Sequence, residues 1–195
     1  MRDGTAGYEK DLDTLVRKLE ALPFEALHRE VLPLFPPPPA SILDLGAGSG
    51  RDAAAFAALG YDVIAVEPAA GLRQRAQELH PAPRITWIDD ALPELSTLRG
   101  AFDIVMLTAV WMHLDLDARP RGMQRIAALL KPGGLTCITL RHGPVPEGRR
   151  MFDVSGADTI RLAEAAGLAP IVHLENQVAV SGNPGVTWTR LAFRK

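Results

Sequence analysis

Cysteine and aromatic residues are scarce in this chain of 195 residues, and long hydrophobic runs are missing. The single cysteine, Cys137, has no second cysteine to pair with, which excludes an internal disulfide and favours a reducing compartment. No apolar run approaches the roughly 18 residues of a membrane-spanning helix, and the polar N-terminus lacks the apolar core of a signal peptide. We therefore expect a cytoplasmic protein that makes no membrane contact.

Excess charge of either sign and recognisable metal motifs are also missing. The formal net charge is −2, so the chain has no global basic field for holding nucleic acid. Patterns such as HExxH, CxxC or paired carboxylates do not occur, and we expect no metal site. A composition of 47% hydrophobic and 23% charged residues is typical of one compact globular domain.

The first 39 residues differ from the rest in their pattern of apolar residues and prolines. Apolar residues recur at helical spacing over residues 9–22, and a second, shorter helix is predicted near Phe24–Val31. Four prolines at 36–39 follow, which favours a stiff connector. We therefore divide the chain into an N-terminal helical cap with a proline linker, residues 1–39, and a main domain, residues 40–195.

Short apolar runs alternate with helical periods through the main domain. The predicted strands are 42–45, 61–68, 84–89, 102–110, 135–141, 169–175 and 186–194, and the predicted helices are 51–59, 71–80, 118–130 and 156–166. This alternation predicts an α/β fold with a doubly wound, mostly parallel seven-stranded sheet and helices on both faces. Only a short loop separates the last two strands, so they should form a C-terminal antiparallel hairpin.

Three local signals refine this prediction. Ser155 and Asp158 are spaced as a capping box for the helix at 156–166. The turn KPGG is expected to precede the strand at 135–141. The segment 100–103 leaves little room for a helix before the strand at 102–110.

The stretch SILDLGAGSGRDAAAFAALG joins the first strand of the main domain to its helix through Gly46, Gly48 and Gly50. Ligands of such folds bind where the first strand turns into its helix, and glycines there let a ligand approach the backbone. The amides at the start of the helix favour a negative group. A phosphate-binding GK[ST] loop is absent, and the dinucleotide fingerprint would require glycine where Arg51 stands.

What remains is the pattern D-x-G-x-G-x-G, which begins at Asp44. It resembles the first motif of class I S-adenosylmethionine-dependent methyltransferases. Four further segments resemble later motifs of that family in the same order: VIAVEP (63–68), WIDDALPEL (87–95), FDIVMLTAVWMHL (102–114) and LLKPGGLTCIT (129–139). The resemblance covers roughly residues 42–141, about half of the chain.

The resemblance implies S-adenosylmethionine as cofactor. An acid that ends the second strand, here Glu67, would accept hydrogen bonds from both ribose hydroxyls. An acid after the third strand would reach the adenine amino group, and Asp90 matches better than Asp89. The residues implied to bind the cofactor are Asp44, Gly46, Ala47, Gly48, Arg51, Glu67, Pro68, Asp90, Ala91 and Thr108.

The acceptor end of the site stays open at this stage. His113 is either a general base or substrate contact, or a packing residue. Trp111 either walls the substrate pocket or belongs to the core. Arg141 and His142 begin a loop, 141–153, that either positions an acidic acceptor or is simply solvated. Tyr8 and the N-terminal helix are expected to fold over the cofactor as a lid.

Methyl transfer from a sulfonium is an in-line displacement, for which the protein mainly aligns the reactants and excludes water. Because the net charge is near zero, we favour a small-molecule acceptor over nucleic acid or protein. Two alternatives remain: an RNA- or protein-modifying methyltransferase, and a cofactor-binding protein without catalysis. Nothing in the sequence fixes the oligomeric state or the acceptor atom.

Overall fold

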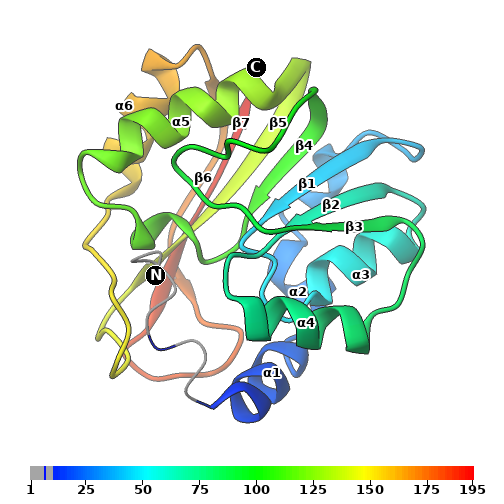
Figure 1. Ribbon diagram of the computed structural model, residues 1–195. Helices are drawn as coiled ribbons and strands as arrows, with labels where there is room; N and C mark the ends of the chain where they lie inside the picture. Colours follow the sequence, from blue (N-terminus) through cyan, green and yellow to red (C-terminus); the bar gives the residue numbers. More distant parts are fainter. Residues whose placement is uncertain (1–6, 8–10) are drawn as a thin grey trace.

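A computed structural model describes residue 7 and residues 11–195 (Figure 1). Seven strands form a single sheet: β1 (Ser41–Leu45), β2 (Asp62–Val66), β3 (Ile85–Ile88), β4 (Phe102–Leu107), β5 (Leu130–His142), β6 (Ala169–Val178) and β7 (Thr187–Arg194). The helices are α1 (Leu12–Glu20), α2 (Phe24–His28), α3 (Arg51–Ala58), α4 (Ala70–Leu79), α5 (Ala118–Leu129) and α6 (Gly156–Ala165), with 3₁₀ turns at Leu32–Leu34 and Trp111–His113.

The strand order is β3-β2-β1-β4-β5-β7-β6. Strands β1 to β5 pair in parallel, while β7 is antiparallel to both of its neighbours, β5 and β6. This confirms the mostly parallel sheet and the C-terminal hairpin. The chain winds outward from β1 in both directions, so the carboxyl ends of β1 and β4 form the crevice in which ligands of such folds bind.

Two apolar layers enclose the sheet, and this is why its central strands read as continuous apolar runs. On one face, α2 and α3 pack through aromatic residues; the rings of Phe24 and Phe56 lie 5.0 Å apart, edge to face. On the other face, α5 and α6 cover a larger cluster that includes Trp111 and Phe193. Both faces of the parallel strands are therefore buried.

Several element boundaries differ from the sequence prediction. β5 begins at Leu130 rather than 135, because the KPGG segment stays in the sheet as an irregularity: Gly133 has φ 76°, and the register against β4 shifts between Phe102 and Ile104. No helix separates β3 from β4 among the described residues, in keeping with the short segment 100–103. The capping box is confirmed, since Ser155 Oγ accepts from the Asp158 amide at 3.0 Å.

The N-terminal helices pack against the edge of the main fold. Asp11 caps α1 by accepting from the Thr14 amide, and Val16 of α1 packs with Ala69 and Leu72 at the start of α4. Tyr8, which the sequence suggested as part of a lid, lies outside the described residues. Within the described part of the chain, no helix is both long and apolar enough to cross a bilayer.

Candidate active site

A cavity of about 970 Å³ opens at the carboxyl ends of β1, β2 and β4. This volume lies at the upper end of the range for small-ligand sites, about 300–1,000 Å³. All of the residues implied to bind the cofactor line it: Asp44, Gly46, Ala47, Gly48, Arg51, Glu67, Pro68, Asp90, Ala91 and Thr108. His113 lines it as well, so the fold brings residues from four separate motifs to one hollow.

The glycine loop is held tightly against neighbouring backbone. The amides of Gly46 and Ala47 both donate to the carbonyl of Val66, at 2.8 and 3.0 Å. Gly46 has φ 70°, and a Cβ placed there would lie 2.5 Å from Cγ2 of Val110. A larger residue would require the Val110 side chain to move and would be strained at this positive φ, so position 46 is suited to glycine.

Glu67 follows β2 and is buried. Its Oε2 accepts from the Gly48 amide and its Oε1 from the Ala69 amide, both at 2.9 Å. Burial raises the pKa of Glu67, and the two amide hydrogen bonds oppose that rise. Each carboxylate oxygen retains a second lone pair, so Glu67 can brace the loop and still accept from two ligand hydroxyls.

Asp44, on β1, is 1% exposed, and its Oδ2 has no hydrogen-bond partner among the described residues. Burial, reinforced by the nearby charge of Asp52, raises the pKa of Asp44 well above its ordinary value. A buried carboxyl oxygen without a partner is costly unless a ligand completes it. The cavity wall therefore holds a site suited to a cationic or donor group.

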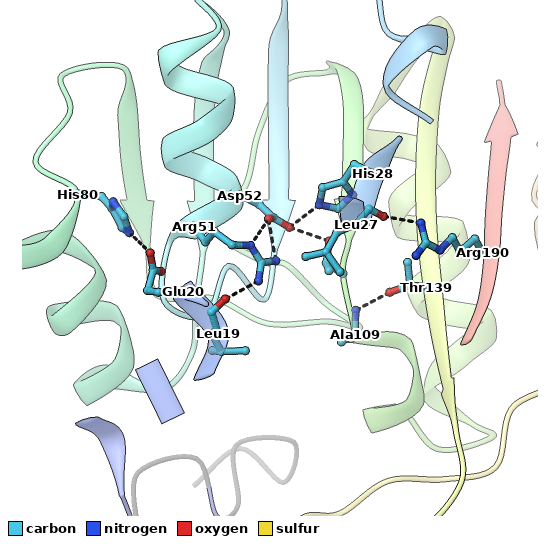
Figure 2. Close-up of polar contacts among 11 residues, drawn as sticks. Leu19, Glu20, Leu27, His28, Arg51, Asp52, His80, Ala109, Thr139 and Arg190 are labelled. Carbon is cyan, nitrogen blue, oxygen red and sulfur yellow. Dashed lines mark hydrogen bonds and ion pairs between the residues drawn. The ribbon is translucent and has the colours of Figure 1, made fainter. Parts of the chain in front are cut away.

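A polar network ties the N-terminal helices to the rim of this cavity (Figure 2). Arg51 donates from Nη1 to the Leu19 carbonyl and from Nε to Asp52 Oδ1, both at 2.8 Å. Asp52 Oδ2 lies 2.9 Å from His28 Nε2 and accepts from Thr108 Oγ1 at 3.1 Å. Burial alone would raise the pKa of Asp52, but the hydrogen bond to His28 and the neighbouring charges lower it to about 2.

This network gives Arg51 a role that differs from the one implied by the motif. Its guanidinium joins the end of α1 to the start of α3, and Leu19, Leu22 and Leu27 close one side of the cavity. Arg51 lines the cavity but is engaged by Asp52, so the backbone amides at the start of α3 are left as the main contacts for an anionic ligand group.

Asp90 braces the loop that joins β3 to β4. It is buried, its Oδ1 accepts from the Ala91 amide, and its Oδ2 accepts from both the amide and the hydroxyl of Thr97, at 2.8 and 2.6 Å. Asp89, in contrast, is exposed and pairs with Arg73 at 3.4 Å. The choice of Asp90 as the cavity residue agrees with this geometry, although its carboxylate also holds the loop together.

His113 stands in the 3₁₀ turn after β4. Its Nδ1 is 2.7 Å from the carbonyl oxygen of Arg150, which can only accept, so Nδ1 carries the proton and Nε2 is the basic nitrogen. Burial lowers the pKa of His113 below its ordinary value, and the Arg150 carbonyl partly offsets this effect. A lowered pKa favours the neutral imidazole, which is the form that a general base requires.

Three residues suggested as acceptor contacts do not line the cavity: Trp111, Arg141 and His142. Trp111 is fully buried among the residues beneath α5, because the 3₁₀ turn directs it into the core. Arg141 Nη1 is 3.4 Å from the Gly143 carbonyl, and His142 Nε2 is 2.8 Å from Thr189 Oγ1. The structure thus favours the core role for Trp111 and separates the start of the 141–153 loop from the cavity.

Other lining residues were not anticipated from the sequence. Asp52 lies in the first turn of α3, where an acid is common, and no sequence pattern links it to His28. Thr139, Trp188 and Arg190 also line the cavity. Trp188 and Arg190 are two positions apart on β7 and therefore lie on the same face of the sheet. The sequence would have indicated both as lining residues only if the pairing of β7 with β5 had been known.

Within the described part of the chain, no group of three or more His, Cys, Asp or Glu side chains could hold a metal ion. Burial raises the pKa of the Cys137 thiol to about 12, so this thiol is not a nucleophile at neutral pH.

Comparison with known proteins gives a consistent result. Residues 42–134 match the family model described as a methyltransferase domain. The biotin biosynthesis bifunctional protein BioHC of Cellvibrio japonicus is 33% identical over 57% of this chain and 22% of its own length. The demethylmenaquinone methyltransferase of Clavibacter sepedonicus is 32% identical over 58% of this chain and 46% of its own length. The matched segment thus spans less than half of these relatives.

A solved structure extends the similarity to nearly the whole chain. The 1,6-didemethyltoxoflavin-N1-methyltransferase of Burkholderia thailandensis, with bound 1,6-didemethyltoxoflavin and S-adenosylhomocysteine, is 26% identical with a TM-score of 0.69. The alignment covers 96% of this chain and 83% of that one. The sheet order, the methyltransferase-domain match over residues 42–134 and the similarity to this solved structure together support a class I S-adenosylmethionine-dependent methyltransferase.

Proposed function

We propose that this protein transfers a methyl group from S-adenosylmethionine to a small-molecule acceptor that binds in the same cavity. The observation that carries this proposal is that one hollow of about 970 Å³ is lined both by the glycine loop and Glu67 and by His113 and Trp188. Its size suits a nucleoside cofactor together with a second small molecule.

The residues present fit the cofactor. The backbone amides at the start of α3, which follow the glycine loop, would take the carboxylate, because the amides of Gly46, Ala47 and Gly48 already donate within the protein. The unpartnered Oδ2 of Asp44 would accept from the ammonium, and Glu67 would accept from the ribose hydroxyls. Asp90, Ala91 and Leu92 would border the adenine. When bound, the cofactor supplies a sulfonium-activated methyl group.

The chain itself contributes alignment, exclusion of water and proton transfer. Leu19, Leu22 and Leu27 wall the cavity from the N-terminal side and limit the access of water. His113 Nε2 would remove a proton from an acceptor that must lose one before or during attack. Thr108 and Ala109 lie at the end of β4, where the acceptor and the methyl group would meet in line.

A fractionation experiment tests the acceptor class. The protein is incubated with S-adenosylmethionine carrying a radioactive methyl group and, separately, with the small-molecule, RNA and protein fractions of a cell extract. We expect label to enter the small-molecule fraction. Label that enters only RNA or protein would favour the modifying alternative. Absence of label from all three fractions, despite cofactor binding, would favour a non-catalytic binding protein.

A distinct result is expected for the nucleic-acid alternative. An RNA footprint on this chain would use the arginines of α5, but these are engaged within the protein: Arg119 and Arg125 donate to backbone carbonyls, and Arg121 pairs with Glu94. We therefore expect weak RNA binding, without the steep salt dependence of a surface that binds phosphates.

A cytoplasmic location is part of the proposed function.

A further inference from the structure

The acceptor end of the cavity contains a buried arginine that the cofactor does not need. Arg190 lies on β7, 8% exposed, and lines the cavity together with Trp188 from the same face of the same strand. Another arginine of the cavity wall, the half-buried Arg51, is held by Asp52 and by the Leu19 carbonyl. Arg190 is therefore the buried cation at the acceptor end of the described cavity.

Only one edge of the Arg190 guanidinium is engaged by the protein. Its Nη1 donates to the Leu27 carbonyl at 2.8 Å and to the carboxylate of Glu30, as the contact with Leu27 in Figure 2 shows. Among the described residues, no hydrogen bond of Nε or Nη2 is found. Neither nitrogen is one of the fully buried unpartnered atoms, and Arg190 lines the cavity, so this free edge can donate to an oxygen of a ligand there.

A second donor lies beside this edge. Thr139 on β5 is the register partner of Arg190, and both line the cavity. Thr139 Oγ1 accepts from the Ala109 amide at 2.8 Å (Figure 2), and no acceptor for its own hydroxyl proton is found among the described residues. The free edge of the Arg190 guanidinium and the Thr139 hydroxyl are thus two neighbouring hydrogen-bond donors without an acceptor among the described residues.

We propose that Arg190 and Thr139 bind a carboxylate, or a planar oxyanion of the same shape, on the methyl acceptor, and that Trp188 packs against the acceptor's apolar body. The proposal rests on the proposed function and names the substrate class of that site. The Nε–Nη2 edge of a guanidinium matches a carboxylate with two parallel hydrogen bonds. The carboxylate of Glu30 contacts only Nη1 of Arg190. Arg190 can therefore bind Glu30 and the ligand carboxylate at the same time, and the Nε–Nη2 edge favours a ligand with two parallel oxygens.

This assignment moves the acidic-acceptor site away from the loop where the sequence suggested it. Arg141 turns to the Gly143 carbonyl, and Arg150 is exposed at the cavity mouth, with its guanidinium 4.9 Å from the ring centre of Phe152. An exposed cation is screened by solvent and discriminates weakly between ligands. Arg190, buried beside Thr139, discriminates more strongly.

The test uses benzoate as the probe and benzamide, which has the same shape without the charge, as its neutral match. Each is added to the protein saturated with S-adenosylhomocysteine, and binding is measured by ligand-observed NMR. We expect benzoate to bind at millimolar concentration and at least tenfold more tightly than benzamide. No benzoate binding, or equal binding of the two probes, would overturn the proposal.

Variants separate a ligand-binding arginine from a merely structural one. Arg190→Gln should weaken benzoate binding at least tenfold, whereas Glu30→Gln, which removes the same ion pair from the other side, should retain it. If both variants lose benzoate equally, Arg190 acts only through the Glu30 contact and the proposal is wrong. Should Arg190→Gln not fold, Thr139→Val against Thr139→Ser tests the same site, and only the valine variant should lose benzoate.

Calorimetry with S-adenosylhomocysteine distinguishes this proposal from the proposed function. If the wild-type protein does not bind S-adenosylhomocysteine, the proposed function fails and the acceptor site fails with it. If it binds S-adenosylhomocysteine but treats benzoate and benzamide alike, only the carboxylate site at Arg190 and Thr139 is refuted.

Discussion

At the scale of single residues, two buried aspartates beside the cavity have opposite proton affinities. Asp52 has His28 and Arg51 as partners and accepts a hydrogen bond from the Thr108 hydroxyl, and its pKa is lowered to about 2. Asp44, about as deeply buried, has one oxygen without a partner and a pKa raised well above its ordinary value. The difference follows from the partners and not from burial. The unpartnered oxygen of Asp44 is therefore suited to a cationic ligand group.

We predict that binding of S-adenosylhomocysteine releases a proton from Asp44. A bound ammonium favours the ionised carboxylate, so in mildly acidic buffer the group should lose a proton as the complex forms. Calorimetric titrations in two buffers of different ionisation enthalpy measure this release. Asp44→Asn should abolish the release and weaken binding by about 10- to 100-fold. A release that persists in the variant would show that another group supplies the proton.

For His113, the prediction concerns the pH dependence of turnover with an acceptor identified by fractionation. Because burial lowers the pKa of His113, the neutral base persists as the pH falls, and kcat/KM should decline only below the ordinary histidine range. His113→Gln should reduce kcat about 100-fold or more and remove this acidic limb. An unchanged profile in the variant would leave His113 a packing residue.

The sequence could indicate which residues gather at the cofactor but not which of them face it. The backbone of a glycine loop and the acid ending β2 are defined by local order, so their motif positions identify them. The role of Trp111 was ambiguous because neighbouring positions of a 3₁₀ turn point in different directions, so a shift of one residue decides whether the side chain enters the core or the cavity. Arg190 was missed because its neighbour Thr139 lies 51 positions earlier in the chain, and only strand pairing brings them together.

At the scale of elements, the contact between α2 and α3 fixes the N-terminal helices on the cavity. We predict that Asp52→Asn lowers the free energy of unfolding by about 3 kcal/mol, because His28 and Arg51 lose their shared buried anion. Urea denaturation at neutral pH measures this. Asp62→Asn is the control, since Asp62 pairs with Arg84 on the surface and should change stability little.

The same pair predicts how stability depends on pH. The pKa of Asp52 is about 2 when folded against 3.8 ordinarily, so its contribution is complete above 3.8 and is lost as the pH falls through about 2. Over that window, stability should fall more steeply in the wild type than in Asp52→Asn. Parallel curves for the two proteins would mean that Asp52 does not titrate as this network requires.

Most elements were predictable because their apolar periods are strong. The exceptions are informative: Pro132 and the two glycines after it are typical of a turn, yet hydrogen bonding to β4 keeps the start of β5 in the sheet. At the start of β5, tertiary contacts therefore outweigh local preference. The connection from β3 to β4 lacks a helix, as the short segment 100–103 predicted, and Asp90 braces that loop through Thr97.

At the scale of the whole molecule, the alternation of elements predicted the parallel sheet and the final hairpin. It did not predict that β7 would lie between β5 and β6, which brings Trp188 and Arg190 to the cavity. A hairpin alone allows either of its strands to lie next to β5, and the sequence contains no signal that chooses. The division of the chain at residues 39 and 40 stays a prediction, as does the number of subunits.

The central claim is that the ends of β1 and β2 form a binding site for S-adenosylmethionine and its product, with Glu67 as the ribose contact. The most direct measurement is calorimetric titration of S-adenosylhomocysteine into the wild type, Glu67→Ala and the surface control Asp89→Ala. We predict micromolar-range affinity for the wild type and Asp89→Ala, and an affinity about 10- to 100-fold weaker for a folded Glu67→Ala. Unchanged affinity in Glu67→Ala would contradict the ribose assignment, and no binding to the wild type would contradict the account as a whole.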